Sequence, residues 1–155
     1  MKRGESGVTL IELVIVMAIV AIMGLYLSPA IGEWLDNYRI RQAARDIAST
    51  LQLAKLKAIS KRLEYRVVFN CGDEDTYHIE RKNSGSWDTD TEETTKTVPK
   101  GVDIDSASFN FGSNKAFFKP DGTCSNGTIT IGNDQGKIYV VVYCTGRIRI
   151  AESPP

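Results

Sequence analysis

The feature that most limits what this chain can fold into is an apolar run near its N-terminus that contains a single charge. Residues 8–31 read VTLIELVIVMAIVAIMGLYLSPAI, and Glu12 is the only charged residue among them. About 20 helical residues, at 1.5 Å each, cross the ~30 Å hydrocarbon core of a bilayer. The preceding residues carry Lys2 and Arg3, which favour a cytoplasmic N-terminus. The sequence therefore predicts a membrane-inserted helix, with the later residues on the far side.

Glu12 has no cation beside it within the apolar run. A carboxylate near the centre of a bilayer costs roughly 2.5–3.5 kcal/mol, and less towards the ends. Cleavage after Gly7 would create a new α-ammonium on Val8, four residues before Glu12. A neighbouring copy, shifted along the helix axis, would then bring its ammonium to this carboxylate. We therefore predict that Glu12 acts in assembly, through an ion pair that only cleavage makes available.

The residues around Glu12 resemble the cleavage and assembly motif of type IV prepilins and type II secretion pseudopilins. The matching string is Gly7-Val8-Thr9-Leu10-Ile11-Glu12, behind a short basic leader. The resemblance implies that a prepilin peptidase cuts after Gly7, that Val8 becomes the N-methylated N-terminus, and that Glu12 serves assembly. Most of the family begins its mature chain with Phe, and Val8 departs from that pattern. Pro29 matches a proline that the family often carries in this helix.

Two other interpretations of the apolar run are an ordinary secretory signal peptide and a plain single-pass anchor. Ser28-Pro29-Ala30 is an imperfect small-x-small cleavage site, and both its Pro29 and the early Glu12 argue against a signal peptide. Gly24 and Pro29 fit any membrane helix. In a pilin they are the places where we expect the helix to bend. Under the signal-peptide or anchor interpretation the chain is an ordinary secreted or anchored domain.

The helical pattern continues beyond the apolar run. Apolar residues recur at spacings of three and four, which marks one face of an amphipathic helix. They are Ile31, Leu35, Tyr38, Ile40, Ala44, Ile47, Leu51, Ala54 and Ala58. Neither Pro nor Gly occurs between Glu33 and Arg62. We predict one helix over about 9–61, apolar all round in its first half and amphipathic in its second.

After residue 63 the pattern changes to period two, which is typical of half-buried strands. Residues 64–70 and 76–82 form one predicted hairpin, and 129–131 and 137–143 form another. Shorter strands are expected near 94–98, 107–111, 115–118 and 147–150. Residues 83–93 are expected to form a polar loop. The predicted fold class is α+β, with a long N-terminal helix packed on an antiparallel β-sheet domain.

The C-terminal part of the chain is similar to the GspH/FimT group, which comprises minor pseudopilins of type II secretion and minor pilins of type IV pili. The similarity rests on Phe117–Gly122, on the predicted hairpin at 129–143 and on Gly146–Ile150. It implies a pilin-like fold and a structural subunit of a type IV pilus or a type II secretion pseudopilus.

The two resemblances together imply how the chain is organised. Residues 1–7 are a leader, 8–30 a transmembrane or filament-core helix, and 31–155 an amphipathic half-helix with a globular β domain. The implied partners are other pilins or pseudopilins, the prepilin peptidase and the inner membrane before assembly. The implied location is single-pass in the inner membrane, with the globular domain in the periplasm, and afterwards in the pilus or pseudopilus.

Three cysteines, Cys71, Cys124 and Cys144, are too few and too scattered for a zinc-finger pattern. The register of the predicted 129–143 hairpin places Cys144 opposite Ser125, and one bulge brings it opposite Cys124. We predict a Cys124–Cys144 disulfide in an oxidising compartment. Cys71 is then left as a small buried hydrophobe, or pairs with one of the other two instead.

Arg147 and Arg149 lie two residues apart on a predicted strand, and hence on one face. In the FimT branch a Gly-Arg-x-Arg string near the C-terminus is associated with DNA binding, and Gly146, Arg147 and Arg149 match it. The same charges also suit a solvated strand edge, where they block unwanted pairing. A DNA-binding minor pilin of natural transformation is therefore the alternative function.

Composition and motifs argue against an enzyme. Lys plus Arg and Asp plus Glu both total 19, so net charge favours no partner. No nucleophile elbow, phosphate-binding loop or dinucleotide fingerprint occurs. His78, the only histidine, has no paired ligand in its strand pattern, and we expect a structural role. The acidic residues of 73–75 and 88–93 are expected to be solvated rather than to hold calcium. We predict no cofactor and no metal.

Overall fold

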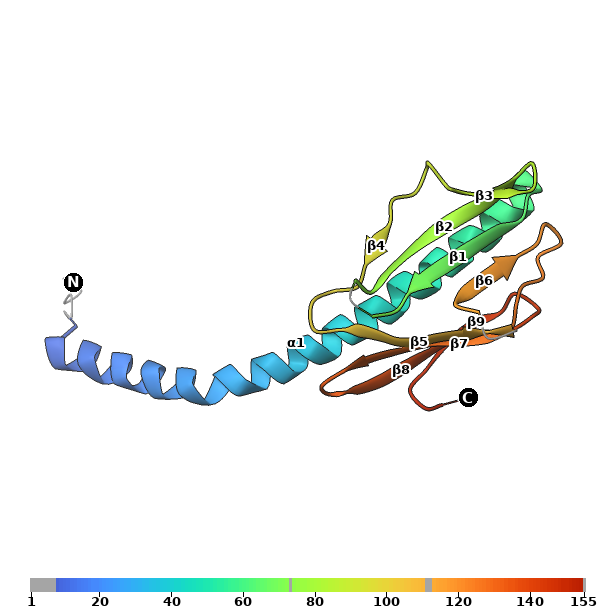
Figure 1. Cartoon of the computed structure of the whole chain (residues 1–155). Coiled ribbons are helices and arrows are strands. Elements are labelled where there is room, and N and C mark those ends of the chain that lie inside the picture. Colours follow the sequence, from blue (N-terminus) through green and yellow to red (C-terminus); the bar gives the residue numbers. More distant parts are fainter. Residues whose placement is uncertain (1–7, 73, 111–112, 155) are drawn as a thin grey trace, which may run out of the picture. The chain divides into compact units, whose positions relative to one another are not determined.

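The computed structural model describes residues 8–72, 74–110 and 113–154, with only the backbone for 25–31. Contacts divide the chain into two compact units, Met1–Leu35 and Asp36–Pro155. Within the described residues, one helix is followed by nine strands (Figure 1).

Helix α1 spans Leu10–Lys61, in agreement with the predicted helix. It ends before Arg62, whose φ of 54° is in the left-handed region that commonly follows a helix. The backbone is helical at both Gly24 and Pro29. A bend at these residues stays a prediction, and the side chain of Pro29 lies outside the described residues.

The second half of α1 buries one face, and that face is rich in alanine. Its buried residues are Ile40, Ala43, Ala44, Ile47, Ala48, Leu51, Ala54 and Ala58. Most of these belong to the predicted apolar face. Leu35 and Tyr38 were also placed on that face, but they are exposed, with 36% and 51% of their surface accessible. The buried stripe therefore begins at Ile40, inside the second unit.

The first sheet contains five strands, of which four follow each other in the chain and the fifth comes after the first strand of the other sheet. They are β1 (Tyr65–Asn70), β2 (Thr76–Asn83), β3 (Ser86–Thr89), β4 (Lys96–Thr97) and β6 (Lys115–Phe118). Their order is β3-β2-β1-β6, and β4 pairs with β2. The β1–β2 hairpin agrees with the prediction, and every pair in this sheet is antiparallel.

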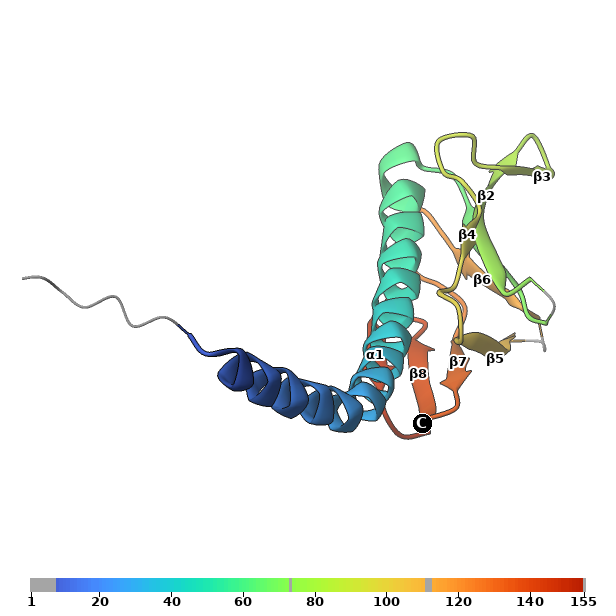
Figure 2. The ribbon, with the colours of Figure 1, turned by 90° about the vertical axis from the view of Figure 1, so that its left-hand side faces the viewer.

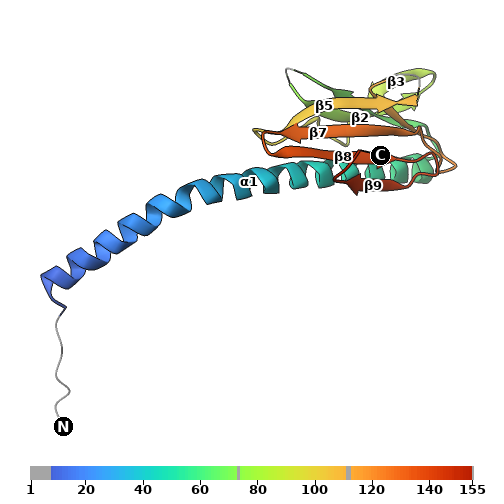
Figure 3. The ribbon, with the colours of Figure 1, turned by 90° about the horizontal axis from the view of Figure 1, so that it is seen from below.

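The second sheet contains the remaining four strands, in the order β5-β7-β8-β9 (Figure 3). They are β5 (Asp103–Phe109), β7 (Gly127–Asn133), β8 (Gly136–Val142) and β9 (Ile148–Ala151). The β7–β8 hairpin pairs Gly132 with Lys137, which is the predicted register. The sequence predicted one sheet, whereas the structure divides the strands between two. The α+β class and the antiparallel pairing are confirmed.

Strand β3 corrects the expectation of a polar loop over 83–93. It forms a hairpin with β2 through Ser84 and Gly85, whose φ values are 49° and 94°. Two successive residues with positive φ are the requirement of a type I′ turn, whose twist matches that of the strands it joins. The Ser-Gly pair was therefore the signal for this hairpin, but the polar residues around it concealed the strand.

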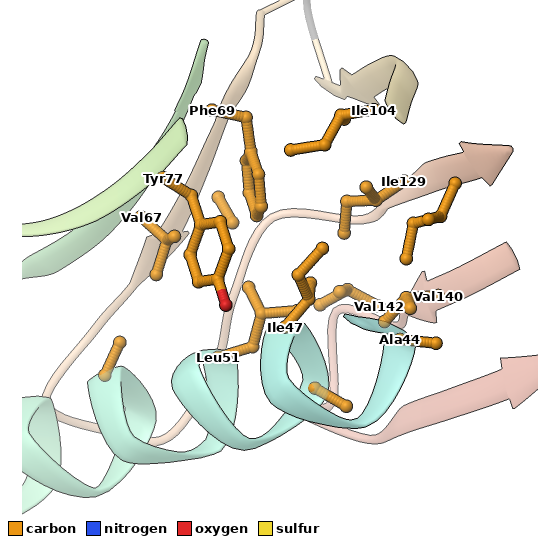
Figure 4. Close-up of a cluster of buried hydrophobic side chains, with 14 of the residues drawn as sticks. Ala44, Ile47, Leu51, Val67, Phe69, Tyr77, Ile104, Ile129, Val140 and Val142 are labelled. Atoms are coloured by element: carbon orange, nitrogen blue, oxygen red, sulfur yellow. The ribbon is translucent and has the colours of Figure 1, made fainter. Parts of the chain in front are cut away.

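The core of the second unit lies between α1 and the inner faces of the two sheets (Figure 2). Figure 4 shows Ala44, Ile47 and Leu51 of α1 facing side chains from both sheets. The first sheet contributes Val67, Phe69 and Tyr77, and the second contributes Ile104, Ile129, Val140 and Val142. Phe69 stacks on both Tyr77 and Phe109, with centroids 6.0 Å apart in each pair. One hydrophobic core thus joins the sheets to the helix.

Candidate functional site

The start of α1 contains the residues predicted to act in processing and assembly. Gly7 lies outside the described residues, and Val8 precedes the helix with 75% of its surface exposed. The backbone N–H of Glu12 donates to Thr9 Oγ1 at 3.3 Å and to Thr9 O at 3.1 Å. Thr9 is therefore the N-cap, and Glu12 occupies the third helical position.

The Thr9–Glu12 pair has the spacing of a capping box, in which the glutamate also reaches back towards the cap. An acidic side chain in the first turn is favourable beside the positive end of the helix dipole. Glu12 therefore has a local reason to be acidic, apart from any partner in another subunit. Sequence reasoning missed this role, although the Thr-x-x-Glu spacing displays it.

The first unit presents large apolar side chains on all sides of α1. Between Leu10 and Met23 the exposed ones are Leu10, Ile11, Leu13, Val14, Ile15, Val16, Met17, Ile19, Val20, Ile22 and Met23. An apolar surface of this extent requires a cover of lipid or protein. Among the residues that the structure describes, no helix meets the combined length and apolarity needed to cross a bilayer.

In the second unit, Lys57 of α1 reaches into a cluster of three acids from the segment after β3. Its Nζ lies 2.8 Å from Asp90, and 3.3 Å from both Glu92 and Glu93. The side chain of Asp90 has no exposed surface, and that of Lys57 is 11% exposed. Asp90 was predicted to be a solvated loop charge, and this was wrong. The cluster ties the segment after β3 to the last turns of α1.

Both partners of the Lys57–Asp90 pair are held in their charged forms. Burial by itself would raise the pKa of Asp90, but the hydrogen bonds from Lys57 and Glu92 N–H, together with the charges of Lys57 and Lys61, outweigh burial, and the pKa is lowered from 3.8. Burial would likewise lower the pKa of Lys57, but hydrogen bonds to Asp90, Glu92 and Glu93 raise it above 10.5. The pair is therefore a buried ion pair, and no proton transfer at neutral pH follows from it.

Gly146 opens the Gly-Arg-x-Arg string, and the structure gives it a local explanation. Its φ is 79°, and an added Cβ would lie 2.5 Å from Lys55 Nζ and 2.6 Å from Gly122 O. Lys55 Nζ donates to Gly146 O at 3.0 Å. Only glycine fits both the backbone conformation and the close approach. Conformation is therefore a sufficient reason for the glycine of this string.

Arg149 lies on β9, whereas Arg147, predicted on the same strand, directly precedes it. Both are exposed, and neither takes part in an ion pair within the described part of the chain. Two basic residues of α1 are neutralised: Arg39 pairs with Asp36, and Arg41 with Glu152. Lys55 of α1 instead lies beside the string, where it donates to Gly146 O.

Cys124 and Cys144 lie side by side on two neighbouring segments, as predicted. The three thiols are nevertheless free in this structure. Cys124 N–H donates to Cys144 O at 3.1 Å, and Cys124 Sγ donates to Tyr143 O at 2.9 Å. Burial raises the pKa of the Cys124 thiol. The disulfide between Cys124 and Cys144 therefore stays a prediction. Cys71, expected to be a small buried hydrophobe, is exposed.

His78 lies beside Glu80 on the outer face of the first sheet, at 3.2 Å. Glu80 also pairs with Arg66 at 2.5 Å. Within the described residues, no group of three His, Cys, Asp or Glu side chains is arranged to hold a metal ion.

These features define a pilin-like protein: an N-terminal helix, apolar all round at its start, whose later half carries antiparallel sheets. The sequence model described as Type II transport protein GspH matches residues 43–146, and the chain belongs to this family. The Prokaryotic N-terminal methylation motif matches residues 2–28. Members of the family are structural pilins and pseudopilins. No curated protein matches the chain.

Solved structures share the fold at low sequence identity. The minor pseudopilin EpsH from the Vibrio cholerae type 2 secretion system aligns with a TM-score of 0.60 at 16% identity, over 74% of this chain and 97% of that one. The type IV minor pilin FimU of Pseudomonas aeruginosa aligns with a TM-score of 0.60 at 17% identity, over 76% and 92%. E. coli GspH aligns with a TM-score of 0.58 at 13% identity, over 75% and 89%.

Proposed function

We propose that this chain is a minor subunit of a type II secretion pseudopilus or a type IV pilus, made as a prepilin and assembled through α1. One observation carries the proposal. One helix links a methylation motif, over residues 2–28, to the GspH domain, over 43–146, in the same chain. The motif implies processing by a prepilin peptidase, and the domain implies assembly with other pilins.

In this proposal the peptidase cuts after Gly7, and Val8 becomes the methylated N-terminus. The position of Val8, exposed and before the first helical residue, is accessible to both reactions. Glu12 then pairs with the Val8 ammonium of an adjacent subunit and fixes the axial register. Its place in the first turn of α1 keeps it at the end of the apolar surface, where a charge costs less than at the centre.

The apolar first half of α1 supports a route from membrane to filament. Before assembly, residues 8–30 span the inner membrane once, and the domain within 31–155 lies in the periplasm. During assembly the exposed apolar surface moves from lipid to the helices of neighbouring subunits. A surface that is apolar all round suits both surroundings, since neither leaves a face in water.

Mass spectrometry of the mature N-terminus tests the processing. We expect a chain that begins at Val8 and carries one added methyl group. A chain that keeps Met1, or one that begins near Ile31, contradicts the proposal.

Three variants separate the assembly role of Glu12 from its capping role. Glu12→Ala removes both the charge and the capping partner, and Glu12→Gln removes only the charge. Thr9→Ala removes the N-cap, at about 1 kcal/mol, and leaves the charge. We expect cleavage in all three variants, and filaments only with Thr9→Ala. If Glu12→Gln also assembles, the ion-pair role is wrong.

DNA binding through Arg147 and Arg149 receives no support from the comparisons, and it forms no part of this proposal.

A further inference from the structure

A hollow on the outer face of the first sheet is not used by the proposed function. Its volume is about 580 Å³, and it lies along β6 and the segment 123–125. Its walls include Arg66, Lys115, Phe117, Lys119, Thr123 and Ser125. This volume is within the range of sites that bind small ligands or a few residues of a peptide.

The hollow is basic, with one aromatic side chain in its lining. Three cations line it, and none of the described lining residues is acidic. Arg66 is neutralised by Glu80 at 2.5 Å, whereas Lys115 and Lys119 form no ion pair within the described residues. Lys115 and Phe117 lie two residues apart on β6 and project from the same face, and Lys119 follows directly after the strand. At the rise of an extended chain, four residues correspond to about 13 Å between the two lysine backbones.

The framework of the hollow is fixed before any ligand arrives. Phe117 N–H donates to Ser125 Oγ at 2.9 Å, and Ser125 N–H donates to Phe117 O at 3.0 Å. On its other side β6 pairs with β1, which places Phe117 opposite Arg66. The ring of Phe117 meets that of Trp87 edge-on, with centroids 5.7 Å apart. A prearranged surface loses little conformational entropy on binding.

Edge protection does not account for the two lysines. Lysine often guards an exposed sheet edge against pairing with another chain. The free edge of β6 is already covered, because Phe117 exchanges hydrogen bonds with Ser125 and Lys119 N–H donates to Thr123 O at 2.9 Å. The unpaired charges therefore remain available to a ligand on the face of the sheet.

We propose that this hollow binds an extended acidic segment of a partner protein. Two carboxylates pair with Lys115 and Lys119, and an apolar side chain between them rests on Phe117. In an extended peptide, residues four apart lie on one face at about 13 Å, with a third residue midway on that face. The spacing of Lys115, Phe117 and Lys119 therefore fits an acidic–apolar–acidic alternation. This inference is independent of filament assembly.

Nucleic acid fits the same charges less well. Sequence-tolerant binding of a single strand needs free aromatic faces for base stacking and a continuous basic track. The Arg66 guanidinium lies over both aromatic rings of this face, 4.2 Å from the centroid of Trp87 and 5.8 Å from that of Phe117. Further along the sheet, Lys82 is neutralised by Glu64 at 2.6 Å. Among the described residues that line the hollow, Lys115 and Lys119 are the cations without an ion pair, and two such charges suit two carboxylates better than a run of phosphates.

Fluorescence anisotropy of the unassembled full chain in nonionic detergent tests the proposal. The probe is a fluorescein-labelled peptide of sequence GEALAEG. We expect saturable binding that weakens with added salt, because the contacts are exposed ion pairs. The double variant Lys115→Gln, Lys119→Gln keeps most of the apolar stems and should bind roughly tenfold more weakly. The matched control is Lys100→Gln, an exposed lysine outside the hollow, which should bind as the parent chain does.

Several results would overturn the proposal. They are an absence of saturable binding, equal binding of the reversed-charge peptide GKALAKG, and a double variant that binds like the parent. Tighter binding of a single-stranded oligothymidylate, lost in the same double variant, would assign the hollow to nucleic acid instead. Since the chain is unassembled in this assay, a negative result leaves the proposed filament function intact. A failure of N-terminal processing, conversely, leaves the hollow unaffected.

Discussion

Removing Lys57 should destabilise the second unit more than removing its partner Asp90. The reason is that Asp90 keeps fewer partners without Lys57 than Lys57 keeps without Asp90. Without Lys57, the Asp90 carboxylate keeps one hydrogen bond, from Glu92 N–H at 3.3 Å, and no exposed surface. An unpaired buried charge of this kind costs about 3–5 kcal/mol. We therefore expect Lys57→Met to lower the free energy of unfolding by about 3–5 kcal/mol.

Without Asp90, in contrast, the Lys57 ammonium still has two acids at 3.3 Å. Asp90→Asn also keeps an oxygen that can accept from Lys57. Its cost should be nearer the ~1–3 kcal/mol of a weakened buried hydrogen bond. The combination Lys57→Met, Asp90→Leu removes both charges and should recover part of the loss, since apolar replacements of buried ion pairs are often neutral.

Thermal unfolding followed by near-UV circular dichroism measures these differences. A loss of 3–5 kcal/mol corresponds to a fall in Tm of roughly 10–15 °C for a domain of this size. Lys61→Met is the matched control, because the ion pair of Lys61 is with the half-exposed Glu92, and the Tm of this variant should change little. Equal losses for Lys57→Met and Asp90→Asn, or a double variant less stable than both, would refute the reasoning.

The same pair sets a pH window. The pKa of Asp90 is lowered in the folded protein, so its contribution is complete above 3.8 and is lost as the pH falls through the lowered value. The pKa of Lys57 is raised, so its contribution is complete below 10.5 and is lost as the pH rises through the raised value. Asp90→Asn lacks this contribution at every pH. Any acid unfolding that the variant still shows therefore comes from its other carboxylates. The parent should lose this particular stabilisation at acidic pH, whereas the variant has none to lose.

Three further outcomes are expected. Gly146→Ala should cost about 1–3 kcal/mol, seen as a lower Tm, because φ is positive and the space for a Cβ is filled; an unchanged Tm would contradict this. Oxidation of the chain should leave one free thiol in a thiol titration, and Cys124→Ser, Cys144→Ser should then cost about 3 kcal/mol; two or more free thiols would exclude the pairing. The chain should bind DNA no better than its Arg147→Gln, Arg149→Gln variant does, and a salt-dependent loss in that variant would revive the DNA-binding alternative.

Periodicity predicted most of the fold, because long elements bury regular faces. The helix over Leu10–Lys61 and the hairpin register of Gly132 with Lys137 were both predictable. The division into two sheets was not, because strand pairing across long sequence separations leaves no periodic signal. Strand β3 was missed since its residues are polar, and the evidence for it lay in the conformational demands of Ser84 and Gly85.

The site was predictable in its linear motifs and not in its spatial contacts. The string Gly7 to Glu12 can be identified by inspection, and Cys124 and Cys144 were correctly placed as neighbours. The Lys57–Asp90 pair joins residues 33 apart in the sequence. Nothing in the local sequence distinguishes this buried lysine from the solvated lysines near it. Likewise the hollow beside Phe117 depends on a loop that returns to cover β6.

The alanine-rich stripe of α1 limits the side-chain volume that this part of the core accepts. Ala44, Ala54 and Ala58 have no exposed surface, so a larger side chain at these positions has no open space to enter. Adding two methyl groups at such a position would force its neighbours or the backbone to move, typically at about 1–3 kcal/mol. Growth in side-chain size should therefore be excluded along this stripe of the helix.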